Sequence, residues 1–452
     1  MPAKMKKPAI KAKAAPKKAI RETPAPSTSS GPSAAPVDPM AAMIKLPRGV
    51  ATPQPLRGMK DILPSEQKYW LHVRNTAEPL ATAYGYDRID TPTLEETALF
   101  ARSIGKQTDI VEKEMFTFVD TGGESMTLRP EATASIVRSY INHGMFNQPQ
   151  PVKLFYWGPM FRHERPQSGR FREFHQFGFE VLGDKHPVLD AEIILIAHLF
   201  FKELGVKTTV QINSLGCPTC RPAYLAELTN YYRAKRSQLC ENCKRRLQKN
   251  PLRLLDCKEA GCVALKEGAP QIVDSLCEEC KNHFMRVLEY LDEIQVPYVL
   301  NPQLVRGLDY YTKTVFEIWP AEETESSQAA LGGGGRYDGL SEVLGGRPTP
   351  ACGFAIGVER AILQLKARGI EPPVRNKPDI FMAQLGDVAR RKVVPLFEEL
   401  RKSGANVASS FSKDSLKSQL EIANRLGARY TLIIGQKEVL DGTVLIRDME
   451  AG

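Results

Sequence analysis

Three arginines stand at positions where strands or helices begin or end, although they lie far apart in the sequence. Arg162 closes the apolar run Phe155-Tyr156-Trp157-Gly158-Pro159-Met160-Phe161, Arg306 opens a second strand-like segment, and Arg360 lies in the first turn of an apolar helix. Guanidinium groups match the geometry of phosphate oxygens, and a helix N-terminus also favours anions. This combination indicates a polyphosphate ligand.

The segment that follows Arg162 adds further charged and polar side chains. Arg170, Arg172, Glu173, Gln176 and Glu180 lie on what reads as the returning strand of a hairpin. Unpaired charge is costly inside a protein, so a sheet face with this content needs a charged ligand. For this segment alone, a solvated hairpin with surface ion pairs is the simpler interpretation.

A run of four glycines, residues 332–335, precedes Arg336-Tyr337-Asp338-Gly339. It lacks both the phosphate-loop pattern and the spacing of a dinucleotide-binding turn, which argues against a dinucleotide site. Two interpretations of the glycines stay open: a close approach of the backbone to a small ligand, or a tight turn.

Eight of the nine cysteines fall between positions 217 and 280. With no signal-peptide pattern, this content predicts a reducing, cytoplasmic compartment rather than a disulfide framework. Three pairs have the spacing of zinc knuckles: Cys217 with Cys220, Cys240 with Cys243, and Cys277 with Cys280. Structural zinc and reduced packing thiols are both open, and two knuckles would complete a tetrahedral site. The leading tetrad is Cys240, Cys243, Cys277 and Cys280.

The elements that must position these residues follow from periodicity. A helix is predicted from residue 65 to a stop at Tyr84-Gly85-Tyr86, and two strands between residues 151 and 180 join through the charged loop 162–170. A helix over 189–204, a strand over 208–215, a mainly helical Cys-rich stretch, a strand within 307–319 and a helix from Val358 come next. After a proline-rich linker, 369–378, strands and helices alternate as in a small α/β domain.

Composition bounds the class of protein. The chain of 452 residues has a net charge of +9, but residues 1–50 hold ten basic and two acidic side chains, which leaves 51 basic and 50 acidic in the remainder. The basic pI therefore reflects the tail and is no nucleic-acid signal for the body. Residues 1–47 are predicted to be disordered because they are rich in Lys, Ala and Pro. No apolar run is long enough for a transmembrane helix, which predicts a soluble protein without a membrane partner.

Taken together, the motifs resemble those of the histidyl-tRNA synthetases, which are class II aminoacyl-tRNA synthetases. Arg57-Gly58-Met59-Lys60-Asp61, with the helix and strand up to Pro92, is similar to the dimer-forming motif 1. Phe161-Arg162-His163-Glu164-Arg165-Pro166 resembles motif 2, and Gly353-Phe354-Ala355-Ile356-Gly357-Val358-Glu359-Arg360 resembles motif 3. Two further stretches are similar to signatures specific to the histidine enzyme: Leu304-Val305-Arg306-Gly307-Leu308-Asp309-Tyr310-Tyr311 and Gly333-Gly334-Gly335-Arg336-Tyr337-Asp338.

The resemblance implies an α+β fold with an antiparallel six-stranded catalytic sheet, flanking helices, a mainly helical insertion and a small α/β anticodon-binding domain. Its expected limits are 48–216 and 301–368 for the catalytic domain, 217–300 for the Cys-rich insertion and 378–452 for the anticodon-binding domain. Family members usually continue for a further strand and helix, so this last domain is expected to be incomplete at its C-terminal end.

The resemblance also implies roles for individual residues. Arg162 and Arg306 would be catalytic by contacting the α-phosphate of ATP, with Arg170 and Arg360 toward the outer phosphates and Mg²⁺ accompanying the nucleotide. Glu131, Thr133 and Gln176 would bind the ammonium group of histidine, and Glu180 and Tyr311 would face its imidazole. Tyr310 and Tyr337 would line the same pocket. Without the family match, helix capping or sheet pairing is the first interpretation of Glu131, Thr133 and Gln176.

The implied function is histidine–tRNA ligation, with ATP, L-histidine and histidine tRNA as partners and a homodimer formed through motif 1. Many relatives are thought to lack a metal in the insertion, which favours packing thiols over zinc there. The alternative is a non-catalytic, histidine-sensing regulatory paralogue of a phosphoribosyltransferase. Such paralogues are degenerate in their phosphate-binding arginines, whereas Arg162, Arg306 and Arg360 are all present here. A different class II synthetase is disfavoured by the two histidine-type signatures.

Overall fold

The computed structural model describes residues 52–322, 330–373 and 377–451. The predicted disordered tail, residues 1–47, lies outside the described residues. Within the described ranges, no helix is both long and apolar enough to cross a membrane.

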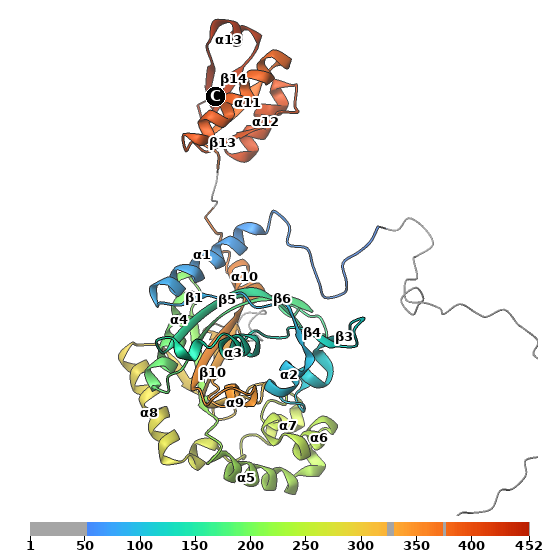
Figure 1. The fold of residues 1–452 in the computed structure, drawn as a ribbon, viewed down its shortest axis with the longest axis vertical. Coiled ribbons are helices and arrows are strands. Elements are labelled where there is room, and N and C mark those ends of the chain that lie inside the picture. Colours follow the sequence, from blue (N-terminus) through green and yellow to red (C-terminus); the bar gives the residue numbers. More distant parts are fainter. Residues whose placement is uncertain (1–51, 323–329, 374–376, 452) are drawn as a thin grey trace, which may run out of the picture. The chain divides into compact units, whose positions relative to one another are not determined.

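The body formed by residues 52–373 is built on one sheet of eight strands (Figure 1). Its order is β1-β5-β6-β11-β10-β9-β7-β8. From β5 to β7 in this order, each of the six strands is antiparallel to its neighbours, as predicted. The short edge strands β1 and β8 pair in parallel with β5 and β7. The strands are β1 (Asp87–Arg88), β5 (Val152–Phe161), β6 (Glu173–Leu182), β7 (Thr208–Ser214), β8 (Tyr298–Leu300), β9 (Thr312–Pro320), β10 (Gly332–Arg336) and β11 (Ala351–Gly357).

Alternation along the strands separates two faces of this sheet. On β6, Phe177 and Phe179 point into a core shared with four helices, whereas Gln176 and Glu180 point to the opposite face. The four helices are α1 (Gln67–Ala83), α4 (Pro187–Glu203), α8 (Glu278–Glu293) and α10 (Val358–Ala367). The second face therefore carries the polar residues of the sequence motifs.

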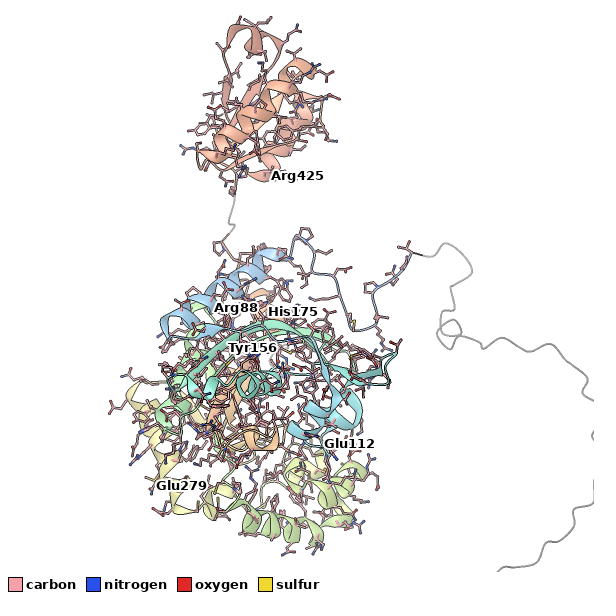
Figure 2. The ribbon with its side chains drawn as sticks, in the orientation of Figure 1. Arg88, Glu112, Tyr156, His175, Glu279 and Arg425 are labelled. Carbon is pink, nitrogen blue, oxygen red and sulfur yellow. The ribbon has the colours of Figure 1, made fainter. Side chains whose placement is uncertain are left out.

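Several shorter elements cover part of that second face. A three-stranded sheet of order β2-β4-β3 stands beside α2 and α3. Its elements are β2 (Leu94–Glu96), β3 (Phe116–Val119), β4 (Ser125–Leu128), α2 (Thr97–Ser103), the π-helical turn η1 (Ile110–Glu114), α3 (Thr133–Asn142), η2 (Met145–Asn147) and α9 (Leu340–Val343). Figure 2 shows Tyr156 on β5 and His175 on β6 within the main sheet, and Glu279 on α8.

The Cys-rich stretch is mainly helical, as predicted. It comprises α5 (Arg221–Ala234), η3 (Arg236–Gln238), α6 (Glu241–Lys249), η4 (Pro251–Leu254), α7 (Ala260–Ala264) and η5 (Ile272–Ser275) before α8 begins. Figure 1 shows α5, α6 and α7 together on one side of the body. Their apolar side chains, among them Tyr224 and Leu254, join the core on the second face of the sheet.

The C-terminal unit, residues 377–451, is a small α/β fold of strand order β13-β12-β14-β15. Its elements are β12 (Ile380–Gln384), α11 (Gly386–Lys402), β13 (Val407–Ser409), α12 (Leu416–Leu426), β14 (Tyr430–Ile434), α13 (Gln436–Asp441) and β15 (Leu445–Asp448). The strands and helices predicted after the proline-rich linker are all present.

The four glycines form strand β10 in the middle of the main sheet, so the tight-turn interpretation is wrong. Glycine has low strand propensity, but pairing with β9 and β11 on both sides supplies the backbone hydrogen bonds. The absent side chains make room: a Cβ at Gly333 would come within 2.9 Å of an Arg306 nitrogen, and one at Gly353 on β11 would collide with the Glu180 carboxylate. The glycines thus let large polar groups lie flat across the strands.

Candidate active site

A cavity of about 640 Å³ opens on the second face of the sheet. Nine of the eleven residues predicted for ATP or histidine line it: Glu131, Thr133, Arg162, Arg170, Gln176, Arg306, Tyr310, Tyr311 and Arg360. They come from β6, α3, α10 and the loops beside β5 and β9, so segments as far apart in the sequence as Glu131 and Arg360 meet in one place.

The other two predicted residues, Glu180 and Tyr337, do not line the cavity. Each side chain is buried, with 1 % of its residue surface exposed. The Tyr337 hydroxyl donates a hydrogen bond to Glu180, and the Thr133 hydroxyl donates another over 2.6 Å. Because Thr133 lines the cavity, Glu180 and Tyr337 form a second layer directly behind its wall.

Arginines dominate one end of the cavity. Arg162 donates through Nε to the Pro130 carbonyl over 2.9 Å, and Arg360 donates to the Gly169 carbonyl over 3.2 Å. The first bond fixes one edge of the Arg162 guanidinium group. Arg360 is held more fully, because its Nη1 also donates to the Ala330 carbonyl. Burial, followed by the nearby charge of Arg170, lowers the pKa of Arg360 from its ordinary value. Cations held this close together favour an anionic ligand between them.

Arg306 crosses the sheet to reach the same end. Its Nη1 donates to Glu317 Oε1 over 2.6 Å, and its guanidinium lies 5.6 Å from the centre of the Tyr311 ring. The Nε atoms of Arg306 and Arg170 are buried and have no hydrogen-bond partner among the described residues. Buried donors of this kind are costly unless a ligand accepts from them.

The opposite end of the cavity carries carboxylate, amide and phenol groups. Glu131 accepts hydrogen bonds from the backbone N–H groups of Thr133 and Ala134 over 2.7 and 3.0 Å, so it caps helix α3. Burial raises its pKa even though those bonds favour the charged form. Gln176 Oε1 is buried and finds no partner in the described chain. An ammonium group could donate hydrogen bonds to both the Glu131 carboxylate and Gln176 Oε1.

Glu180 is the most strongly perturbed carboxyl group of the site. Burial raises its pKa to about 8, against the hydrogen bonds from Thr133 and Tyr337, which favour ionisation. A carboxyl group that titrates near neutrality, in a pocket of tyrosines, can either accept from or donate to a heterocyclic nitrogen.

The predicted zinc tetrad does not assemble. The structure divides its members between two separate groups: Cys240 and Cys243 join Cys257 and Cys262, whereas Cys277 and Cys280 join Cys217 and Cys220. The physical reason is the path of α5, which leaves the sheet at Cys220 and carries the next knuckle away, while α8 returns beside the first one.

The sequence interpretation missed the charged residues that the insertion and its neighbours bring to the cavity. Arg253, Asp256 and Lys258 line it, and so does Asp109 on the facing segment. Asp109 accepts from Arg246 over 2.8 Å and from Arg253 over 3.1 Å, and these ion pairs tie the insertion to η1. Only tertiary packing creates these contacts, so no local pattern pointed to them.

Comparison with known proteins follows the same division of the chain. The sequence model of the family described as histidyl-tRNA synthetase matches residues 58–361. The chain belongs to the histidyl-tRNA synthetase family. A model described as an anticodon binding domain matches residues 379–452.

Individual histidyl-tRNA synthetases are similar along most of the chain. The histidine–tRNA ligase of Dehalococcoides mccartyi is 49% identical over 398 residues, which are 88% of this chain and 95% of that protein. The histidine–tRNA ligase of Pelotomaculum thermopropionicum is also 49% identical, over 88% of this chain and 93% of its own length. The crystal structure of the apo histidyl-tRNA synthetase of S. aureus superposes with a TM-score of 0.74 at 37% identity, covering 88% of this chain and 98% of that one.

Proposed function

We propose that this protein is a histidine–tRNA ligase and that the cavity performs both of its steps. In the first step a carboxylate oxygen of histidine attacks the α-phosphorus of ATP, which forms histidyl-adenylate and releases pyrophosphate. In the second step a hydroxyl of the terminal tRNA ribose attacks the acyl carbon, which forms histidyl-tRNA and releases AMP.

The observation that carries this proposal is the pairing of two unsatisfied groups in one cavity. Among the residues that the structure describes, Arg306 Nε is a buried donor without an acceptor, and Gln176 Oε1 is a buried acceptor without a donor. A ligand with a phosphate at one end and an ammonium at the other satisfies both. Histidyl-adenylate has those two groups.

Fixed cations supply the catalysis of the first step. Negative charge grows on the α-phosphoryl oxygens as the carboxylate oxygen approaches and the bond to pyrophosphate breaks. Arg162 and Arg306 are held by the Pro130 carbonyl and the Glu317 carboxylate, so they stabilise this charge without reorganising. Arg170 and Arg360 would hold the outer phosphates, which leave as pyrophosphate.

ATP would bring Mg²⁺ on its phosphate oxygens. The carboxylates on the arginine side of the cavity, Glu164 and Glu317, are oxygen ligands of the kind that Mg²⁺ prefers. Both are already paired with arginines, so the nucleotide itself would supply much of the coordination.

Recognition of the amino acid would rest on the other end. Glu131, Thr133 and Gln176 would bind its ammonium group, Tyr310 would pack beside them, and Tyr311 would contact the imidazole. Glu180, supported by Tyr337, would act on the imidazole from behind Thr133 and Gly353. Two ring nitrogens that each need a partner separate histidine from other side chains of similar size.

Binding of tRNA would involve the C-terminal unit, since residues 379–452 match an anticodon binding domain. We also propose a homodimer formed through the motif 1 region. Three leucines there expose at least half of their surface: Leu56 at 70%, Leu63 at 56% and Leu71 at 50%. A cytoplasmic location agrees with the nine free cysteines.

ATP–pyrophosphate exchange with each of the twenty amino acids tests the proposed activity. Histidine alone should support exchange, and histidine tRNA should then become acylated. Exchange with another amino acid would contradict the specificity. No exchange by a folded protein that binds histidine would instead support the regulatory alternative, which the three intact phosphate-facing arginines disfavour.

A further inference from the structure

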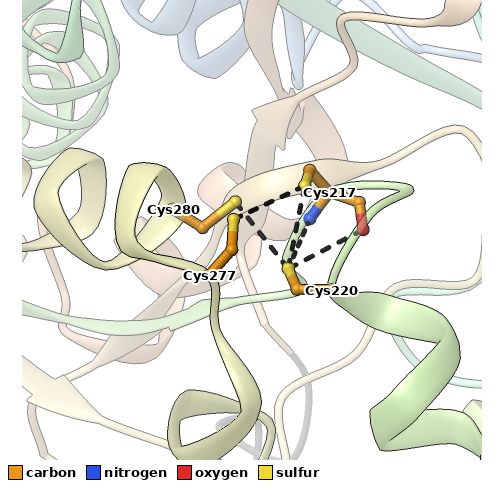
Figure 3. Close-up of side chains that lie close together, drawn as sticks. All are labelled: Cys217, Cys220, Cys277 and Cys280. Atoms are coloured by element: carbon orange, nitrogen blue, oxygen red, sulfur yellow. Dashed lines mark hydrogen bonds between the residues drawn. The ribbon is translucent and has the colours of Figure 1, made fainter.

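The eight cysteines between positions 217 and 280 converge in two groups of four. In each group the four sulfurs lie within 4.8 Å of one another. Figure 3 shows the first group, where the turn after β7 meets the start of α8. We name this group the sheet cluster and the second group, among α6, η4 and α7, the helix cluster. The sheet cluster is Cys217, Cys220, Cys277 and Cys280, and the helix cluster is Cys240, Cys243, Cys257 and Cys262.

The sulfur spacing fits one shared metal ion. Zinc–thiolate bonds of about 2.3 Å in a tetrahedron put the sulfurs about 3.8 Å apart. In the sheet cluster, Cys217 Sγ lies 3.7 Å from Cys220 Sγ and 3.8 Å from Cys277 Sγ, and Cys220 Sγ lies 3.9 Å from Cys280 Sγ. A four-iron cluster binds each thiolate through a different iron and would spread the sulfurs farther.

The helix cluster repeats this geometry on different elements. Cys240 Sγ lies 3.9 Å from Cys257 Sγ. Cysteines of both clusters lie at helix N-termini. Cys240 is the N-cap of α6 in the helix cluster, and Cys220 and Cys277 are the N-caps of α5 and α8 in the sheet cluster. Helix N-termini stabilise thiolates, the form in which cysteine binds a metal.

Backbone N–H groups point at the sulfurs in both clusters. Cys217 N–H donates to Cys220 Sγ over 3.2 Å. In the helix cluster, Cys243 N–H donates to Cys240 Sγ over 3.4 Å, and Cys240 N–H donates to Cys262 Sγ over 3.3 Å. Such donors orient and stabilise metal-bound thiolates from the second layer of a site.

A cation is also available at the sheet cluster. Arg221, the residue after Cys220, donates to the carbonyls of Leu215, Gly216 and Tyr311. Four thiolates around a divalent ion carry a net negative charge, which a neighbouring guanidinium offsets. Thiols that served only to fill space would need neither this charge nor a tetrahedral arrangement.

We propose that each cluster binds one zinc ion through its four thiolates. The two sites are structural, because every tetrahedral position is taken by protein and none is left for a substrate. They fix the short helices of the insertion, where α6 has nine residues and α7 has five, against the catalytic sheet.

Metal analysis of the whole protein gives the first test. Protein purified through a tag that uses no metal, without chelator, should contain about two zinc ions per chain. Replacement by cobalt should produce the thiolate-to-cobalt charge-transfer band and the intense visible bands of a tetrahedral four-thiolate site. Metal-free protein that is fully active and develops no such bands would overturn the proposal, and bound iron in place of zinc would overturn the choice of metal.

Single-cysteine variants assign the ions to the two clusters. Cys280→Ser and Cys257→Ser should each reduce the zinc content by about one ion per folded chain, and the double variant should retain none. Cys352→Ala is the matched control, because Cys352 is buried on β11 outside both clusters and its loss should leave the zinc content unchanged. A cluster whose variant keeps both ions is not a metal site. The cobalt spectrum of the unmodified chain decides the case if a variant does not fold.

Discussion

The catalytic sheet and the Cys-rich insertion hold polar groups in their interiors by different means. In the sheet, Arg336 has no exposed surface, and its guanidinium pairs with the buried carboxylate of Asp190. That pair is one part of a layer already fixed by five antiparallel ladders and an aromatic core. In the insertion α6 and α7 have only nine and five residues, and eight cysteine sulfurs, five of them on buried residues, are gathered in fours.

The two regions therefore depend on different interactions to maintain their structure. The sheet is held by its own backbone ladders and by the buried pair of Arg336 and Asp190, so its framework should tolerate loss of a ligand or a metal. The insertion depends on groups that converge from separate turns, so removal of one sulfur should loosen it locally. The cavity receives residues from both regions, and its function should respond to each in a distinguishable way.

The largest expected effect comes from Arg306→His. The variant keeps a polar ring but loses the permanent charge and the fork, so adenylate formation in a single turnover should slow by ~10²- to 10⁴-fold. Binding of ATP and histidine should change much less, because the added negative charge is not yet present in the ground state. Transfer from preformed adenylate to tRNA should also be affected less.

Arg88→His, a half-exposed arginine on β1, is the matched control and should leave the rate unchanged. If Arg306 only pairs within the sheet, its loss should lower the melting temperature instead. A variant with the native melting temperature and an unchanged activation rate would remove Arg306 from the mechanism.

Arg336→Met should cost the sheet about 3–5 kcal/mol of unfolding free energy, because it leaves the buried charge of Asp190 without the guanidinium and with only His283 beside it, 3.4 Å away. Burial opposes ionisation of Asp190, but the charge of Arg336 and hydrogen bonding outweigh it and lower its pKa to about 2. A carboxyl group whose pKa is lowered in the folded state stabilises the fold at every pH above its unfolded-state pKa. This stabilisation is lost only as the pH falls toward 2. The defect should therefore persist at neutral pH.

Urea unfolding followed by tryptophan fluorescence measures this effect, since all three tryptophans lie between residues 70 and 319, in the body. The double variant Arg336→Met, Asp190→Leu should recover part of the loss because no unpaired charge remains. An equally unstable double variant would show that the packing around Arg336, and not its charge, supports the sheet.

The same two regions differ in how well sequence predicts them. Arg162, Arg306 and Arg360 were predictable because each belongs to a local motif whose strand or helix fixes its direction. Alternation along β6 likewise puts Gln176 and Glu180 on one face. The burial of Glu180 and Tyr337 behind the cavity wall was not predictable, because it depends on the absent side chain of Gly353 on another strand.

The cysteine partners could not be derived from spacing. Three knuckles of equal spacing allow several pairings, and Cys257 and Cys262 form no knuckle at all. Which knuckle meets which depends on how α5 and α8 leave and rejoin the sheet, and that is a property of tertiary packing. The edge strand β1 lies within the strand predicted up to Pro92. The other edge strand, β8, was not predicted, because its three residues carry no measurable periodicity.

Loss of the sheet-cluster metal should also disturb the end of the cavity that is proposed to bind histidine. Gly216 accepts a backbone hydrogen bond from Lys313 over 2.9 Å, and Arg221 donates to the Tyr311 carbonyl, so the cluster is bonded to the segment that carries Tyr311. Lys313 also has a φ of +48°, a conformation that needs support. Cys280→Ser should therefore raise the KM for histidine by ~3- to 10-fold, with a smaller change for ATP.

Steady-state kinetics of pyrophosphate exchange gives both constants. Cys257→Ser is the comparison variant, because the helix cluster adjoins Asp256 and Lys258 at the cavity wall, whereas the bond to the Tyr311 carbonyl comes from Arg221 beside the sheet cluster. Equal changes in the two Michaelis constants for Cys280→Ser would mean that the sheet cluster supports the insertion without positioning the histidine pocket.

The smallest expected effect is a pH dependence that belongs to Glu180. In the empty pocket its pKa is about 8, and free imidazole has a pKa of about 6.5. If the bound pair holds one proton, no net proton moves between these values, and the KM for histidine is lowest there. Below that window the protonated free imidazole must lose a proton on binding. Above it the empty pocket must gain one, so the KM for histidine should rise about threefold from pH 7 to 8.5.

Glu180→Gln should abolish the upper limb that the carboxyl contributes and leave only the titration of the amino group of histidine. Stability provides an independent check of the sign. A carboxyl group whose pKa is raised in the folded state binds its proton more tightly there, so its contribution is greatest below the unfolded pKa of about 4.5 and is lost as the pH rises toward 8. The melting temperature of the unmodified protein should accordingly fall more between pH 5 and 8 than that of Glu180→Gln. Parallel pH profiles for the two proteins, in both KM and melting temperature, would show that Glu180 is ionised throughout this range and that the imidazole meets a permanent negative charge.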